Sequence, residues 1–159
     1  MILSLPILYK IIPVKVAKLY KFNDIKIEEM PVPQIGSRQA LVKVKVCGIC
    51  SGDVMPWYIE KKAPLVLGHE ISGEIIKIGD EIREEINLKE GDRVSVHHHA
   101  PCMECFHCQR GDYVQCDTWR NSKVFPGGIA EYILLPEVII KIWFLSSLGR
   151  KPVGIFTKI

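Results

Sequence analysis

Hydrophobic and polar residues alternate over several short stretches of this chain, and a period of two is typical of half-buried β-strands. The clearest stretch is 41–47, where valines at every second position alternate with Lys43 and Lys45. Further strands are predicted at 14–17, 25–28, 70–78, 93–96, 129–135 and 138–142. Many short strands with little helical periodicity indicate an all-β barrel or sandwich.

Turn and helix signals lie between these stretches. Asn23-Asp24 predicts a turn between the first two strands. Gly73, inside the strand predicted at 70–78, indicates a bulge or a close backbone approach. Residues 51–58 contain Pro56 and predict a single helical turn. The aromatic residues of this segment could either line a pocket or pack in the core.

Composition excludes several classes of protein. The chain has 159 residues, of which 48% are hydrophobic, which is enough for one domain with its own core. The net charge of +3 comes from interspersed acidic and basic residues without a basic stripe, which argues against a nucleic-acid partner. No apolar run approaches the roughly 18 residues of a membrane span. The N-terminus lacks the pattern of a secretory signal, so a cytoplasmic, reducing environment is expected.

Four of the six cysteines form a C-x2-C-x2-C-x7-C cluster at Cys102, Cys105, Cys108 and Cys116. Four thiolates this close in sequence can surround one zinc ion tetrahedrally and leave no open position. Cysteines two residues apart rarely meet disulfide geometry, and an iron–sulfur cluster is the third alternative. We favour a structural zinc that holds a loop with too few apolar residues to fold unaided.

A second group of potential ligands comprises Cys50, His69 and Glu70, with Asp53 close to Cys50. Three protein ligands would leave one tetrahedral position open for water or substrate, as a catalytic zinc requires. Read alone, the CxxC formed by Cys47 and Cys50 also fits a redox pair or half of a zinc ribbon. The residues at 69 and 70 favour Cys50 as a metal ligand, with Cys47 as a small buried thiol.

Histidines provide a further candidate. Three consecutive residues, His97 to His99, resemble a metal-binding tract, and His107 lies inside the cysteine cluster. In a strand, however, His98 would face away from His97 and His99. We therefore do not predict an independent third metal site.

Taken together, residues 15–142 resemble the N-terminal catalytic domain of zinc-dependent medium-chain alcohol and polyol dehydrogenases. The resemblance rests on Cys50 with Asp53, on a Gly68-His69-Glu70 pattern extending to Gly79, on Gly91-Asp92-Arg93-Val94, and on the four-cysteine cluster. It implies a mainly β fold, a GroES-like β-barrel with a zinc-binding cysteine lobe and a few short helices.

The resemblance also implies roles for individual residues. Cys50, His69 and Glu70 would bind a catalytic zinc, and Asp53 would orient His69. Cys102, Cys105, Cys108 and Cys116 would bind a structural zinc, making two zinc ions per chain. The catalytic zinc would polarise the hydroxyl of a small alcohol or polyol for hydride transfer to NAD or NADP.

Three features depart from the family pattern. Family members usually have Thr or Ser immediately before the aspartate, where a hydroxyl begins a proton relay. Here that position is Gly52, and Ser51 or a water molecule would have to substitute. Residues 1–14 form an extension, and 143–159 form an atypical tail without the G-x-G-x-x-G of a dinucleotide-binding domain. We therefore expect a truncated or frame-shifted dehydrogenase.

Two other functions fit parts of the pattern. A standalone, non-catalytic zinc-binding barrel could act as a scaffold or partner module. A GroES-type co-chaperonin would share the barrel but has no use for seven metal-type ligands. The apolar residues near the C-terminus need burial, which favours truncation or a homo-oligomer formed through the tail.

Overall fold

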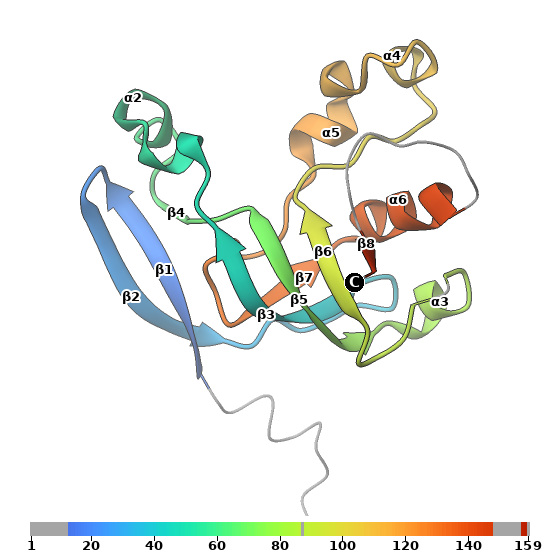
Figure 1. The fold of residues 1–159 in the computed structure, drawn as a ribbon, viewed down its shortest axis with the longest axis horizontal. Coiled ribbons are helices and arrows are strands. Elements are labelled where there is room, and N and C mark those ends of the chain that lie inside the picture. The colour runs from blue at the N-terminus through green and yellow to red at the C-terminus, as the bar shows by residue number, and fades with distance from the viewer. Residues whose placement is uncertain (1–12, 87, 148–156, 159) are drawn as a thin grey trace, which may run out of the picture.

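The computed structural model describes residues 13–86, 88–147 and 157–158. The strands form two antiparallel sheets, with the orders β2-β1-β4 and β7-β3-β5-β6-β8 (Figure 1). Their bounds are Pro13–Lys21 (β1), Asp24–Pro31 (β2), Ala40–Gly48 (β3), Leu65–Val66 (β4), Glu70–Ile78 (β5), Arg93–His97 (β6), Tyr132–Leu135 (β7) and Thr157–Lys158 (β8). Most of the predicted N-terminal extension and of the predicted tail lies outside the described residues.

The first hairpin follows directly from the sequence. β1 pairs with β2 in antiparallel register, and the turn contains Asn23 with a φ of 65°. Asparagine tolerates this left-handed conformation because its side chain can bond to the local backbone. Alternate residues of β1, including Val14 and Val16, are buried. The predicted pair of strands and its turn are confirmed.

The segment before β7 joins the two sheets. The Glu131 amide donates to the Lys15 carbonyl of β1 at 3.1 Å, and the Val44 amide of β3 donates to the Glu131 carbonyl at 2.9 Å. One residue thus bonds to strands of both sheets, so the sheets curve around a shared interior. The predicted mainly β fold with short helices and a GroES-like architecture is confirmed.

The main core lies between β3, β5, β6, β7 and the last long helix. Its fully buried side chains include Val42, Ile71, Ile75, Ile78, Ile82, Val94, Ile133, Leu135 and Ile140. Each such side chain contributes about 1.5–3 kcal/mol by leaving water. Gly73 lies against β3, because a Cβ there would be 2.4 Å from the Lys43 carbonyl oxygen. The predicted close backbone approach is confirmed, and the β3–β5 register shifts nearby.

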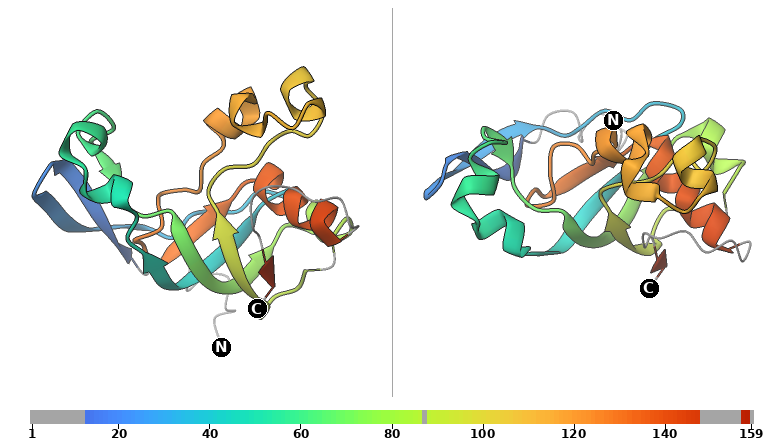
Figure 2. Two further views of the ribbon diagram at one scale, coloured as in Figure 1. Left: turned by 45° about the horizontal axis from the view of Figure 1, so that its top comes forward. Right: turned by 90° about the horizontal axis from the view of Figure 1, so that it is seen from above.

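All helices except the last are one turn long. They are η1 (Ser51–Val54), α2 (Pro56–Ile59), α3 (Asp80–Arg83), α4 (Phe106–Gln109), η2 (Tyr113–Gln115), α5 (Asp117–Asn121) and α6 (Glu137–Ser147). Figures 1 and 2 show that η1 with α2, and the segment carrying α4 and α5, form two separate projections beyond the sheets. Within the described part of the chain, no helix is long and apolar enough to span a membrane.

The strand predicted at 138–142 is wrong, because this segment belongs to helix α6. Its β-branched residues suggested a strand, but Ile139, Ile140 and Ile142 all contact the main core from helical positions. Glu137 and Lys141 also form an ion pair one helical turn apart, at 2.5 Å. Tertiary packing of an apolar helix face thus overrides local β propensity.

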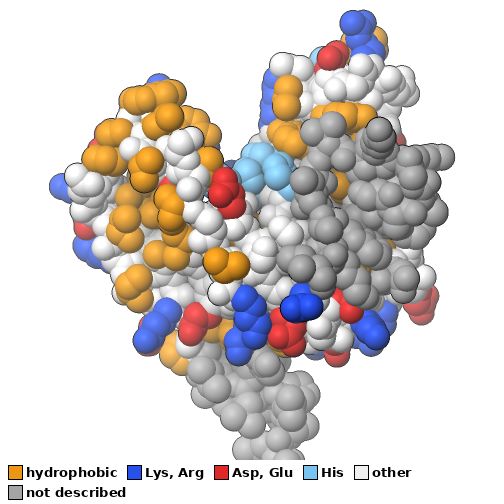
Figure 3. Space-filling model, viewed as in Figure 1, with side chains coloured by type: hydrophobic (Ala, Val, Ile, Leu, Met, Phe, Trp, Pro, Cys, Tyr) orange, Lys and Arg blue, Asp and Glu red, His pale blue; other side chains and the backbone are white. Residues whose placement is uncertain are grey.

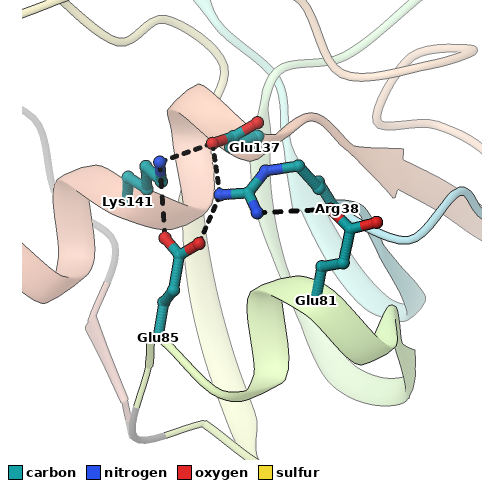
Figure 4. A network of polar contacts seen from close by, with 5 residues as sticks. All are labelled: Arg38, Glu81, Glu85, Glu137 and Lys141. Carbon is teal, nitrogen blue, oxygen red and sulfur yellow. Dashed lines mark hydrogen bonds and ion pairs between the residues drawn. The ribbon is translucent and has the colours of Figure 1, made fainter.

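Arg38 connects α6 to the rest of the molecule (Figure 4). Its guanidinium lies 2.6 Å from Glu85, 2.7 Å from Glu137 and 3.4 Å from Glu81. Lys141 completes the network through Glu85 at 3.4 Å and through Glu137. Hydrogen bonds from Arg38, and then from Lys141, lower the pKa of Glu137 to about 2.

We expect Arg38→Met to lower the free energy of unfolding at pH 7 by more than the loss of an isolated surface ion pair, but only modestly, since the network is partly exposed and screened by solvent. The pKa of Glu137 is depressed, so its contribution is fully present above its ordinary pKa of 4.5 and is lost as pH falls towards 2. Urea unfolding at pH 7 and pH 3 should therefore show a smaller difference between variant and parent at the lower pH.

Arg83→Met is the matched control. Arg83 pairs with one carboxylate, Glu90, and both side chains are about half exposed. Its loss should cost less than about 0.5 kcal/mol. Equal effects of the two substitutions would show that the Arg38 network gives no added stability.

Candidate metal centre and adjoining pocket

Three predicted ligands meet where β3 ends and β5 begins. β3 ends at Gly48, two residues before Cys50, and Gly48 pairs with Glu70 in the antiparallel ladder. His69 immediately precedes β5. The Cys50 sulfur, a His69 ring nitrogen and a Glu70 carboxylate oxygen lie within 4.8 Å of one another. Strand pairing therefore brings together ligands separated by nineteen positions.

Gly48 leaves the space that the Glu70 carboxylate occupies. A Cβ at position 48 would lie 2.6 Å from Glu70 Oε2 and 3.2 Å from Glu70 Cβ. A larger residue would displace the carboxylate from Cys50 and His69. The arrangement of the three ligands thus depends on a glycine at this position.

Asp53 supports the same cluster from η1. Its Oδ2 accepts a hydrogen bond from the Cys50 amide at 3.1 Å, and its Oδ1 lies 3.7 Å from His69 Nδ1. The Asp53 side chain is only 7% exposed, whereas that of His69 is 27% exposed. A buried carboxylate facing one ring nitrogen favours presentation of the other nitrogen to a metal.

The donors of this cluster fit a zinc ion. Thiolate, imidazole and carboxylate are the usual zinc ligands, with bonds of about 2.0–2.3 Å. Tetrahedral angles then separate the ligand atoms by roughly 3.3–3.8 Å. Donor atoms that already lie within 4.8 Å of one another need only small side-chain adjustments to bind one ion.

The four cysteines of the second cluster also converge. Cys102, Cys105, Cys108 and Cys116 present their sulfurs within 4.8 Å of one another. Individual sulfur–sulfur distances are 3.9 Å for Cys102–Cys108, 3.5 Å for Cys105–Cys108 and 3.6 Å for Cys102–Cys116. All four are free thiols, so the cluster is not disulfide-linked. These separations match the edges of a tetrahedron around zinc.

Backbone amides stabilise negative charge on part of this cluster. Burial acts to raise the pKa of Cys116, but amides of Cys102 and Trp119 outweigh it and hold this pKa at about 6. Burial, followed by the contact with Cys105, raises the pKa of Cys108 to about 12. A divalent cation would relieve the repulsion among neighbouring thiolates and keep all four ionised.

The cysteine lobe, residues 102–116, has almost no core of its own. Within this fully described segment, Cys108 and Cys116 are the only buried residues. Phe106 and Val114 are instead 64% and 59% exposed. Apolar packing within the lobe therefore contributes little to holding its turns together.

The histidine tract lies beside the Cys50 cluster. β6 pairs with β5 so that His97 faces Glu70, and the next residue, His98, lies with its ring 4.5 Å from that of His69. His98 Nδ1 is buried and has no hydrogen-bond partner among the described residues. Burial, and then repulsion from His99 and His69, lowers the pKa of His98 to about 3, so its ring is neutral at pH 7.

The ring of Trp119 packs against the other two histidines, His97 and His99. Its ring stacks on His99 at 5.6 Å and lies 5.3 Å from the ring of His97. His99 Nδ1 also lies 3.1 Å from the Ser122 carbonyl oxygen. Trp119 belongs to α5, directly after the cysteine lobe, so this aromatic stack connects the lobe to the histidine tract beside the Cys50 cluster. No local sequence pattern indicates this connection, because it depends on tertiary packing.

A pocket of about 670 Å³ opens beside His69. We call it the His69 pocket. Figure 3 shows histidine side chains at the base of the hollow between the projection with α2 and the projection with the cysteine lobe. The pocket lining includes Asp53, Tyr58, Lys62, His69, His98, Arg120 and Lys123. A smaller cavity of about 460 Å³ reaches Cys50, His69 and Glu70.

The ring of Tyr58 lies against Gly52, the position where family members usually carry a hydroxyl side chain. A Cβ at this position would lie 3.2 Å from Tyr58 Cε1, so the Tyr58 ring closely approaches the place of the missing side chain. Tyr58 also lines the His69 pocket, whereas Trp57 is 64% exposed. Of the two aromatics in this segment, one therefore contributes to the pocket.

Cys47 is a half-buried thiol that packs against the main core.

Comparison with known proteins identifies the class. Residues 36–142 match the family model of the alcohol dehydrogenase GroES-like domain. This match covers more than half of the chain, and the chain belongs to this family of medium-chain alcohol and polyol dehydrogenases. The family recognised from the sequence motifs is therefore confirmed.

Particular relatives have related activities. Sorbitol dehydrogenase from Bombyx mori is 36% identical over 126 residues, covering 73% of this chain and 35% of that protein. L-threonine 3-dehydrogenase from Symbiobacterium thermophilum is 38% identical over 121 residues, covering 70% and 33%. An alcohol dehydrogenase from Escherichia coli CFT073, solved with NADH, has a TM-score of 0.65 and 29% identity, with 80% of this chain and 37% of that one covered. The chain thus spans about a third of the length of such proteins.

We expect Gly48→Ala to weaken divalent metal binding at the Cys50 cluster at least about tenfold, because the added methyl displaces the flexible Glu70 carboxylate. Co²⁺ titration followed by absorption spectroscopy would measure the effect, with circular dichroism to verify the fold. Gly36→Ala, where the nearest contact would be a side-chain oxygen at 3.3 Å far from the cluster, should leave affinity unchanged. Unaltered Co²⁺ affinity in Gly48→Ala would contradict the steric argument that this glycine is needed for the arrangement of the three ligands.

Proposed function

We propose that this chain is the zinc-binding catalytic domain of an NAD(P)-dependent alcohol or polyol dehydrogenase. The observation that carries the proposal is the convergence of Cys50, His69 and Glu70 within 4.8 Å, beside a pocket, in a member of this family. Three ligands leave one tetrahedral position for the substrate oxygen.

Each residue has a distinct role in this proposal. Cys50, His69 and Glu70 would hold the catalytic zinc, and Asp53 would orient both the Cys50 backbone and the His69 ring. The bound zinc would act as a Lewis acid that lowers the pKa of a substrate hydroxyl. The neutral His98 ring beside His69 would help to exclude water from the reacting oxygen.

The cysteine lobe would hold a second, structural zinc. Its four sulfurs leave no open position for a substrate, and its lack of a core makes the ion a folding requirement. The proposed content is two zinc ions per chain, bound by Cys50, His69 and Glu70 and by Cys102, Cys105, Cys108 and Cys116.

The substrate and nucleotide belong to the proposal for the complete enzyme. Relatives are named for sorbitol, L-threonine and related alcohols, and one was solved with NADH. A small alcohol or polyol would bind in the hollow next to His69. Hydride transfer would require NAD or NADP. This chain corresponds to about a third of the relatives' length, and the nucleotide would be bound by the rest of the complete enzyme.

The zinc content of purified chain tests both sites. We expect about two zinc ions per chain, about one in His69→Ala with the fold intact, and about one in Cys105→Ser with loss of structure in the cysteine lobe. Elemental analysis with circular dichroism and limited proteolysis would measure these quantities. Reversed effects of the two substitutions would show that the roles of the clusters are exchanged.

Cobalt substitution separates catalysis from a purely structural role. A non-catalytic barrel would retain zinc in the cysteine lobe but would not bind an alcohol at a metal. Cobalt-substituted chain should therefore change its visible spectrum on addition of D-sorbitol, and His69→Ala should abolish the change. A spectrum insensitive to alcohols would support the scaffold function instead.

A further inference from the structure

We propose that the substrate of this enzyme carries an anionic group, and that Lys62, Arg120 and Lys123 bind it at the mouth of the His69 pocket. The inference rests on the proposed function, because the hydroxyl of the same molecule would bind the catalytic zinc. A phosphate monoester of a small polyol is the class of substrate that the pocket suits best.

The charge of the pocket lining is the first observation. Three permanent cations, Lys62, Arg120 and Lys123, line the same pocket as His69. Asp53 is the only carboxylate of this lining, and it is directed towards His69 and the Cys50 amide. The remaining lining is apolar or neutral, so the hollow has a net positive charge.

The bonding of these cations is the second observation. Elsewhere in the molecule Arg38, Lys45 and Arg83 pair with carboxylates. Among the described residues, no carboxylate forms an ion pair with any of the three pocket cations. Lys62 donates to the Tyr58 hydroxyl, which fixes its position but leaves its charge unneutralised. Arg120 is held by the Val114 carbonyl oxygen at 3.4 Å and by Gln115, neither of which is charged.

The placement of the cations is the third observation. Lys62 follows α2, whereas Arg120 lies in α5 and Lys123 just after it, and all three line the pocket. Helices α2 and α5 belong to the two separate projections (Figure 1). Cations on opposite walls can approach one anion from two directions. A dianionic phosphate has enough acceptor oxygens to bond to all three side chains.

The pocket also relates the anion to the reacting centre. Its volume of about 670 Å³ is within the range that holds a small ligand, and His69 lines both this pocket and the cavity containing Cys50. A polyol phosphate could thus place a hydroxyl near the metal ligands and its phosphate near the cations. A neutral polyol of the same length could accept hydrogen bonds from these side chains but would lack the attraction between opposite charges.

Isothermal titration of the zinc-loaded chain with D-sorbitol 6-phosphate and with D-sorbitol tests the inference. We expect the phosphorylated compound to bind at least about tenfold more tightly, and its affinity to fall as NaCl is raised. Lys62→Met and Lys123→Met should each weaken its binding by about fivefold or more, and should weaken the binding of D-sorbitol much less.

Lys61→Met is the matched control, since Lys61 is exposed, lies over the Trp57 ring at 5.8 Å and is not part of the pocket lining. It should not alter binding of either compound. Equal affinities for the two compounds, or equal effects of Lys61→Met and Lys62→Met, would overturn the inference. Zinc analysis of the same samples separates failure of the anion site from failure of the proposed function. Normal zinc content without a preference for the phosphorylated compound would refute the anion site alone. Absence of zinc at Cys50 would refute the proposed function.

Discussion

Antiparallel pairing of β3 with β5 is the constraint on which the rest of the site depends. It places Cys50 next to His69 and Glu70, and the pairing of β6 on the other side of β5 adds His98. Most buried residues of these strands belong to the main core, so the proposed ligands lie within or next to well-packed strands. Backbone pairing of the strands thus limits how far these side chains can move apart.

Much of this arrangement could be predicted from the sequence. Alternation around Lys43 identified strand β3, in which Val42 is buried and Val44 is partly buried, whereas Val46 is exposed. The spacing of the cysteines identified the lobe, because few other structures need four thiols within fifteen residues. Both signals are local in sequence. The grouping of Cys50 with His69 and Glu70 was different, since it rested on their residue types and was then supported by the resemblance to a family, not by close spacing in the sequence.

Features that depend on tertiary structure could not be predicted in this way. Residues 138–142 have β propensity, yet they form a helix because the core accepts an apolar helix face there. The approach of His98 to His69 depends on a strand register that composition does not reveal. The contact between the Tyr58 ring and Gly52 could not be predicted either, because nothing in the local sequence relates these two positions.

The nearly coreless cysteine lobe has a consequence for ligand binding. Arg120 and Lys123 lie four and seven residues after Cys116, so order in the lobe helps to position the wall that carries them. On the proposed zinc occupancy, metal at the distant lobe and an anion in the pocket favour the same folded state. The two equilibria are then thermodynamically linked, and each ligand raises the apparent affinity for the other. The availability of zinc would thereby influence how tightly the proposed pocket site binds its anion.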